Sequence, residues 1–297
     1  MNAVTRKAPA KINLGLDIVG RRADGYHLLE TVFQTVSVYD CLTVSHRTQA
    51  GISLTCSVKN VPCDATNLVW KAAEAFCRAA EITPQFHIDL EKHIPSQAGM
   101  GGGSTDAAAV LLALQELTGV TLPQEQLLQI AVKLGADVPF FLYGGTAYAA
   151  GIGEALEQLP ACALPYLVIA KGNEGVSTPA AYRAVDALVC PKHPPVQKLR
   201  EALIAGAGVQ EIAPLCGNLF ESAVALPEVT AIRQQMLASG ALCSVMTGSG
   251  AAVFGIFDGQ EQAELACAAL RNVMPFAVCC HTATCLLYTS PSPRDCS

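Results

Sequence analysis

Residues 95–106 constrain the fold of this chain more than any other stretch, because glycine fills four of the five positions from 99 to 103. Glycine adopts backbone torsions and allows close approaches that a Cβ would forbid. A glycine loop that opens into a helix directs free N–H groups and the positive end of the helix dipole to one point. Such a point suits an anion, most often phosphate. The helix is predicted to be amphipathic and to stop at Gly119, with an apolar face of Ala107, Val110, Leu111, Leu114 and Leu117.

The familiar phosphate-binding motifs do not fit this loop. A P-loop needs Lys and then Ser or Thr after its last glycine, and here Ser104 and Thr105 follow Gly103. A dinucleotide-binding fingerprint needs glycine at position 104 and an acidic residue about twenty positions later, at the end of a strand. Glu125 lies inside a helical pattern instead. A glycine-rich turn without any ligand is disfavoured, because ordering four glycines costs much conformational entropy.

The composition indicates a compact protein of two domains. The 297 residues are long for a single core, and 51% of them are hydrophobic while 15% are charged. The net charge of −6, without any basic run, makes nucleic acid an unexpected partner. An anionic substrate would therefore depend on individual lysines, backbone amides and helix ends.

The chain contains thirteen cysteines but no Cys-x-x-Cys pair, so the spacing of a zinc ribbon or a thioredoxin-like site is lacking. The sequence starts without an apolar signal segment, and no run in it predicts a membrane span. We interpret the thiols as reduced and mostly buried. The expectation is a cytoplasmic protein with no membrane partner.

A first strand is predicted over residues 8–19, where apolar and polar residues alternate, after a short exposed lead over residues 1–7. Lys11 and Asn13 fall on the same face of this strand. The pattern alone leaves two alternatives, because these two side chains form either a functional pair or part of a solvated outer face.

Four further residues have more than one interpretation. Asp137 lies among apolar neighbours, where a buried carboxylate is costly, so it either caps or turns the chain or serves catalysis. Asn67 precedes a helix predicted over residues 70–80 and suits an N-cap. His27 follows an Asp-Gly turn and is either structural or functional. Tyr182 is either a core residue or a ligand contact.

Residues 95–107 resemble the ATP-binding loop of the GHMP kinases, named for galactokinase, homoserine kinase, mevalonate kinase and phosphomevalonate kinase. The loop departs from the commonest family form at Gln97, where a small residue is usual. Other segments resemble the branch of this family that acts on a cytidine-diphosphate-linked alcohol, and the likeness covers residues 8–283. These segments are Pro-Ala-Lys-Ile-Asn-Leu from position 9, Arg-Ala-Asp-Gly-Tyr-His from 22, Gly-Ala-Asp-Val-Pro from 135 and Gly-Ser-Gly from 248.

The resemblance implies an α+β fold of two domains with the active site in the cleft between them. Residues 1–159 would form a ribosomal-protein-S5-like, ATP-binding domain, and residues 160–285 a ferredoxin-like domain that begins with a linker over residues 160–165. Residues 286–297 have a Ser-Pro-Ser-Pro composition without apolar periodicity, so we expect a disordered, non-native tail. Further helices are predicted over residues 123–134, 196–205 and 227–239.

The resemblance also implies an activity, the ATP-dependent phosphorylation of the 2-hydroxyl of 4-diphosphocytidyl-2-C-methyl-D-erythritol in non-mevalonate isoprenoid synthesis. ATP would be the co-substrate and Mg²⁺ the cofactor. Asp137 would be the catalytic base, and Lys11 would offset the charge that develops beside it. The ATP-binding residues implied are Asn67, Lys92, Pro95, Ser96, Gln97, Ala98, Gly99, Met100, Gly101, Gly102, Gly103, Ser104 and Thr105. The substrate-binding residues implied are Asn13, Tyr26, His27, Tyr182, Gly248 and Ser249.

Two alternatives to this activity stay open. The chain could be a GHMP kinase for a different alcohol, or a catalytically silent nucleotide-binding protein on the same fold. The presence of Lys11, Asp137 and the whole glycine loop favours catalysis over silence. The sequence leaves open whether the protein is a monomer or a homodimer and which group binds Mg²⁺, for which Ser104 is a candidate.

Overall fold

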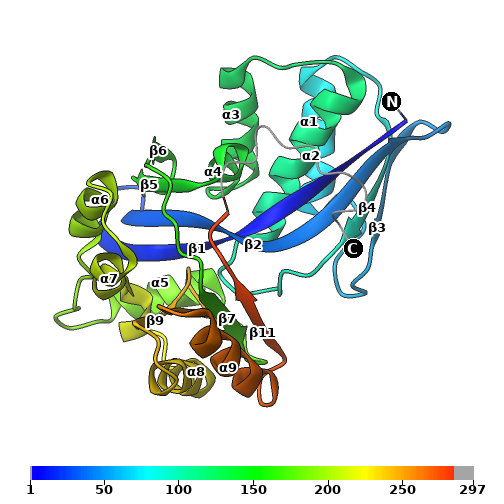
Figure 1. Cartoon of the computed structure of the whole chain (residues 1–297). Coiled ribbons are helices and arrows are strands. Elements are labelled where there is room, and N and C mark those ends of the chain that lie inside the picture. The colour runs from blue at the N-terminus through cyan, green and yellow to red at the C-terminus, as the bar shows by residue number, and fades with distance from the viewer. Residues whose placement is uncertain (1, 284–297) are drawn as a thin grey trace.

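A computed structural model gives the fold of residues 2–283 (Figure 1). The predicted tail over residues 286–297 lies outside the described residues, as do the last two residues of the predicted second domain. Within residues 2–283 the chain forms a seven-stranded mixed sheet and a four-stranded antiparallel sheet, and helices pack on both. The α+β class expected from the sequence is confirmed.

The first sheet is organised around two long antiparallel strands, β1 (Ala3–Arg21) and β2 (His27–His46), which cross the molecule in Figure 1. The strand order is β3–β4–β2–β1–β8, and β5 pairs with both β2 and β6. β1 pairs with β2 from Ala3 onward, and Val4 is buried, so the expected exposed lead over residues 1–7 is wrong. The other strands are β3 (Gly51–Cys56), β4 (Gln85–Glu91), β5 (Thr146–Ala150), β6 (Ala155–Gln158) and β8 (Gly217–Asn218).

The glycine loop leads into α2 (Gly102–Thr118), which packs on β1 and β2. Helix α2 is surrounded by α1 (Leu68–Ala79), α3 (Gln124–Leu134) and α4 (Val138–Tyr143). Every residue from 105 to 114 is therefore buried, and the predicted amphipathic character is wrong for this helix. Its end is as predicted, because Gly119 has a left-handed φ of 72°.

The second sheet has the strand order β11–β7–β10–β9. In chain order the strands of this sheet are β7, β9, β10 and β11. Numbered in that order, they lie across the sheet as 4-1-3-2. This is the βαββαβ arrangement of a ferredoxin-like domain, as expected. The elements are β7 (Leu167–Lys171), α8 (Pro227–Ala238), β9 (Cys243–Met246), β10 (Val253–Ile256), α9 (Gln260–Arg271) and β11 (Phe276–Cys280).

Three helices lie between β7 and α8 and bring the chain back to the first sheet. They are α5 (Thr178–Asp186), α6 (Val196–Ile204) and α7 (Val209–Ile212). Strand β8 then pairs in parallel with β1, with Gly217 opposite Gly15. One buried cluster contains Ile12 of β1 together with Leu167 and Phe254 of the second sheet. The two sheets thus share a core, while a domain boundary near residue 160 stays a prediction.

Most of the described cysteines are buried or partly buried, as expected; Cys63, Cys190 and Cys279 are exposed. Burial raises the pKa of the Cys162 thiol to about 11, which keeps it protonated at neutral pH. Over residues 2–283, no helix has the length and apolar character needed to cross a membrane.

Candidate active site

The glycine loop lines a cavity of about 250 Å³ together with Lys92 and Ile94. Gly101 occupies the N-cap position of α2 with a φ of 74°, and no side chain caps the helix there. A Cβ on Gly101 would lie 2.6 Å from Cζ of Phe141, which explains why only glycine fits. The N–H groups at the start of α2 therefore remain available for an anion beside the loop.

Lys11 on strand β1 lies close to Asp137 at the start of α4. Lys11 Nζ lies 3.8 Å from Asp137 Oδ2, and the two side chains are 4% and 35% exposed. Asp137 occupies the N-cap position of α4, but its side chain makes no capping hydrogen bond, so the geometry gives no support to the capping alternative. Burial lowers the pKa of Lys11, and the carboxylate of Asp137 opposes this shift.

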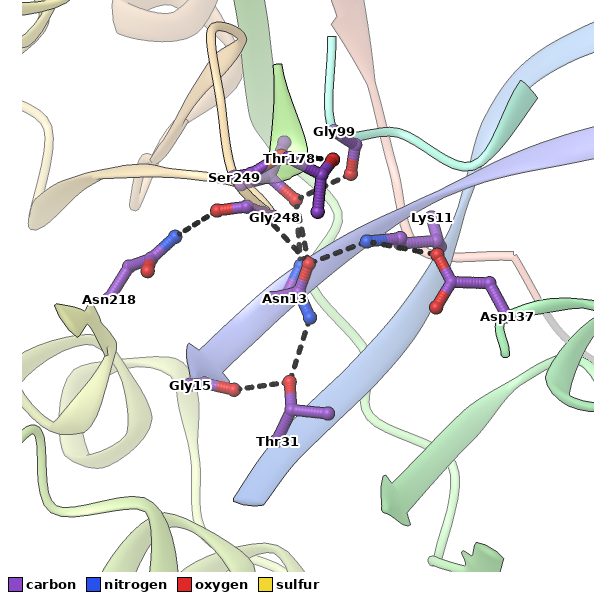
Figure 2. A network of polar contacts seen from close by, with 11 residues as sticks. Lys11, Asn13, Gly15, Thr31, Gly99, Asp137, Thr178, Asn218, Gly248 and Ser249 are labelled. Atoms are coloured by element: carbon purple, nitrogen blue, oxygen red, sulfur yellow. Dashed lines mark hydrogen bonds and ion pairs between the residues drawn. The ribbon is translucent and has the colours of Figure 1, made fainter. Parts of the chain in front are cut away.

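Asn13 connects Lys11 to the Gly-Ser-Gly turn (Figure 2). Its Oδ1 accepts hydrogen bonds from Lys11 Nζ at 2.7 Å, from the Gly248 N–H at 2.9 Å and from Thr247 Oγ1 at 3.1 Å. Its Nδ2 donates to Thr31 Oγ1 at 2.7 Å. Lys11 and Asn13 are buried, so the alternative of a solvated outer face is wrong, and Asn13 holds the lysine in place.

The Gly-Ser-Gly turn packs against the glycine loop. A Cβ on Gly99 would lie 2.1 Å from the carbonyl oxygen of Thr247. Asn218 Nδ2 donates to the Gly248 carbonyl at 2.8 Å, and Ser249 Oγ is 3.0 Å from Thr178 Oγ1. Together with Lys11, Asn13 and Asp137, residues of this turn line a cavity of about 160 Å³.

A larger cavity of about 650 Å³ adjoins it and combines residues from distant parts of the chain. Tyr26, His27, Asp137 and Tyr182 all line it, and Ser104 reaches it from the start of α2. The rings of His27 and Tyr182 stack with centroids 4.6 Å apart and an angle of 18° between their planes. Tyr26 is 62% exposed. Five residues predicted from the sequence to lie in the site thus surround one cavity.

Comparison with known proteins identifies the family of the chain. Residues 67–145 match the GHMP kinases N terminal domain, and residues 193–275 match the GHMP kinases C terminal domain. A protein of Desulfitobacterium hafniense (strain Y51), named 4-diphosphocytidyl-2-C-methyl-D-erythritol kinase, is 43% identical over 274 residues, which are 91% of this chain and 93% of that protein. The chain belongs to the GHMP kinase family.

Two further relatives extend this comparison. A Lachnoclostridium phytofermentans protein with the same name is 40% identical over 268 residues, covering 90% of this GHMP kinase and 92% of the relative. A solved structure titled crystal structure of 4-(cytidine 5'-diphospho)-2C-methyl-D-erythritol kinase matches with a TM-score of 0.80 at 38% identity, covering 94% of this chain and 99% of that one. The predictions of the family, of an ATP-dependent small-molecule kinase and of the fold are confirmed.

Two of the predicted ATP-binding residues are engaged by the protein itself. Asn67 caps α1, where its Oδ1 accepts from the Val69 N–H at 2.9 Å, and it lies outside the three cavities described above. Lys92 lies between two buried carboxylates: its Nζ contacts Asp40 and is 2.7 Å from Asp106 Oδ2. Burial raises the pKa of Asp106 to about 8, although Lys92 opposes the shift. Contacts of Asn67 and Lys92 with ATP stay predictions.

Sequence reasoning missed several residues of this GHMP kinase site. Asp186 Oδ1 lies 2.6 Å from Nε2 of His27, and Asp186 lines the larger cavity. It lies one helical turn after Tyr182, so a helix over this segment would have placed the two on one face. Thr247 immediately precedes the Gly-Ser-Gly motif, a position that could have drawn attention to it. Nothing in the sequence marks Asn218.

The residues of the cavity are compatible with Mg²⁺. Mg²⁺ takes oxygen ligands, usually one or two from the protein and the rest from phosphates and water. The Ser104 hydroxyl and the Asp137 carboxylate line the same cavity and provide such oxygens. Within residues 2–283, no group of three or more His, Cys, Asp or Glu side chains could hold a metal by itself.

Proposed function

We propose that this GHMP kinase transfers the γ-phosphate of ATP to the 2-hydroxyl of 4-diphosphocytidyl-2-C-methyl-D-erythritol, in the non-mevalonate route to isoprenoids. The observation that carries the proposal is the 650 Å³ cavity, which has Tyr26, His27 and Tyr182 in its wall together with Asp137. A substrate with an aromatic base and a distant hydroxyl matches that distribution of side chains. The names of the relatives at 43% and 40% identity support the same substrate.

Phosphoryl transfer requires mainly positioning and charge stabilisation. The backbone N–H groups of the glycine loop would hold the phosphates of ATP. Asp137 would take the proton from the substrate hydroxyl, which would lie in the 160 Å³ cavity that Asp137 shares with Lys11. The Lys11 ammonium, oriented by Asn13, would stabilise the negative charge that develops on the attacking oxygen.

The rest of the substrate would occupy the larger cavity. Tyr26, His27 and Tyr182 would hold the cytidine, and Arg21 and Arg183 line the same cavity and bring positive charge for the diphosphate. Asn13, Gly248 and Ser249 line the smaller cavity and would surround the methylerythritol end.

Mg²⁺ would be held by phosphate oxygens of ATP and by the Ser104 hydroxyl. When bound, it neutralises charge on the phosphate oxygens during transfer. The same proposal places the enzyme in the cytoplasm, where its thiols stay reduced. A monomer and a homodimer are both compatible with it.

A coupled ADP-release assay tests the substrate. With ATP and Mg²⁺ present, we expect turnover of 4-diphosphocytidyl-2-C-methyl-D-erythritol and none of mevalonate, homoserine or galactose. Equal or faster turnover of any of the other three alcohols would assign a different GHMP kinase activity. ATP binding without ADP release for all four would favour a catalytically silent protein.

A further inference from the structure

Asp186 joins two segments of the cavity wall that are far apart in the sequence. It is the last residue of α5, and its Oδ1 lies 2.6 Å from Nε2 of His27, the first residue of β2. Its Oδ2 lies 3.6 Å from Nη1 of Arg21. The bond to His27 lowers the pKa of Asp186, so the carboxylate is ionised at neutral pH.

The ionised carboxylate determines which nitrogen of His27 carries the hydrogen. A carboxylate only accepts hydrogen bonds, so Nε2 must be the donor in this contact. In a neutral imidazole with the hydrogen on Nε2, the other nitrogen, Nδ1, is an acceptor. Within residues 2–283, Nδ1 has no hydrogen-bond partner, and the ring stacks on that of Tyr182 with an angle of 18° between the planes.

We propose that Asp186 is a positioning residue that sets the base specificity of the cavity: it holds His27 with Nε2 as the donor, which leaves Nδ1 of the neutral ring as a hydrogen-bond acceptor. An exocyclic amino group, as in cytosine, can donate to such an acceptor. In uracil a carbonyl oxygen stands at the same place. Both this oxygen and Nδ1 of His27 are acceptors, so neither would form a hydrogen bond. The inference rests on the proposed function, because it takes His27 to contact the base.

Calorimetric titration of the full chain with cytidine diphosphate and with uridine diphosphate tests this role without requiring turnover. The unmodified protein should bind the cytidine nucleotide at least about tenfold more tightly, the effect of one buried hydrogen bond made or lost. Asp186→Asn should reduce this ratio to within about threefold, because an amide can donate or accept and so permits either tautomer. Asp186→Glu restores a carboxylate and should recover part of the ratio.

Asp24→Asn is the matched control. Asp24 lies on the neighbouring turn, bonds the Tyr26 N–H and pairs with Arg22, and it has no contact with His27. This variant removes the same charge and should keep the ratio of the unmodified protein. Thermal melting checks that each variant folds, and Asp186→Ala replaces Asp186→Asn if the latter does not fold.

Three results would overturn the inference: an unmodified protein that binds both nucleotides equally, an unchanged ratio in the Asp186 variant, or an equal fall of the ratio in Asp24→Asn. The proposed function fails separately, if the unmodified protein releases no ADP with the cytidine-linked alcohol. Turnover of that alcohol together with an unchanged ratio in Asp186→Asn would reject only the role of Asp186.

Discussion

Gly99 and Gly248 lie backbone against backbone: a Cβ on Gly248 would be 2.9 Å from the Cα of Gly99. The glycine loop follows strand β4 of the first sheet, and Gly248 belongs to the turn that joins β9 and β10 of the second sheet. Their contact fixes the distance between the phosphate-binding loop and the substrate cavities. Two glycine motifs separated by almost half the chain are thus required by one close approach.

Two glycines of the same loop should respond oppositely to alanine. Gly101→Ala would place a Cβ at a left-handed φ and against Phe141, so we expect a loss of about 2–4 kcal/mol in the free energy of unfolding and weaker ATP binding. Gly103 has an open surrounding, and Gly103→Ala should instead raise helix stability by up to about 1 kcal/mol. Urea denaturation and ATP titration measure both effects. Equal stability of the two variants would contradict the packing described here.

Removal of the proposed base should stop turnover without loss of nucleotide binding. In Asp137→Asn the amide keeps the size of the side chain but accepts no proton. We expect kcat to fall at least about a hundredfold, the contribution of general base catalysis, with little change in the Kd for ATP. Asp24→Asn, which changes a carboxylate outside the cavities, should keep its activity. An Asp137→Asn enzyme with more than a tenth of the original kcat would reject this role.

Loss of the Tyr182 ring should raise the KM for the substrate and leave the KM for ATP unchanged. Tyr182→Ala removes a ring that lines the larger cavity, and stacking on a base contributes about 1–3 kcal/mol. We therefore expect the KM for the cytidine-linked alcohol to rise about tenfold to a hundredfold, with an unchanged KM for ATP. Tyr182→Phe keeps the ring and should stay near the original KM. A parallel rise in both KM values would indicate a general loss of structure.

Asp106 should make the stability depend on pH. Its pKa rises from 3.8 to about 8 on folding, because it is buried, so the native state holds a proton that the unfolded state has released. The free energy of unfolding should fall as the pH rises from about 4 to about 8, by at most about 1.4 kcal/mol per unit, and then level off. Asp106→Asn should flatten this dependence, whereas Asp89→Asn, on an exposed strand position, should not. Urea denaturation at several pH values measures the free energy of unfolding. If its dependence on pH is unchanged in Asp106→Asn, Asp106 is not its source.

Local patterns predicted the elements well where the chain carries its own signals. Gly119 ends α2 and Gly135 ends α3, because a helix end depends on a few adjacent residues. The burial of α2 on all sides could not be predicted, since it depends on helices that come from other parts of the sequence. The start of β1 at Ala3 likewise depends on its pairing with β2.

The same distinction holds for the site. The sequence indicated Lys11, Asp137 and the glycine loop because each lies in a short segment that resembles the GHMP kinases, and their roles stay predictions. The hydrogen bonds of Asn13 to Thr247 and of His27 to Asp186 join residues more than 150 positions apart, and no local pattern records them. Asn67, by contrast, depends on its neighbours in the sequence: the local pattern predicts an N-cap, and the structure contains that cap.

Strand β1 connects the two halves of the chain, so the enzyme should not be divisible into two separately folded parts. Gly15 and Leu16 pair with Gly217 and Asn218, and Asn13 bonds the turn at Gly248, so the first strand depends on residues from late in the chain. A chain cut within residues 160–165 would leave those hydrogen-bonding groups and the shared apolar cluster exposed on both fragments. We expect neither fragment to fold into an active protein by itself. The two halves should therefore unfold together, in a single thermal transition.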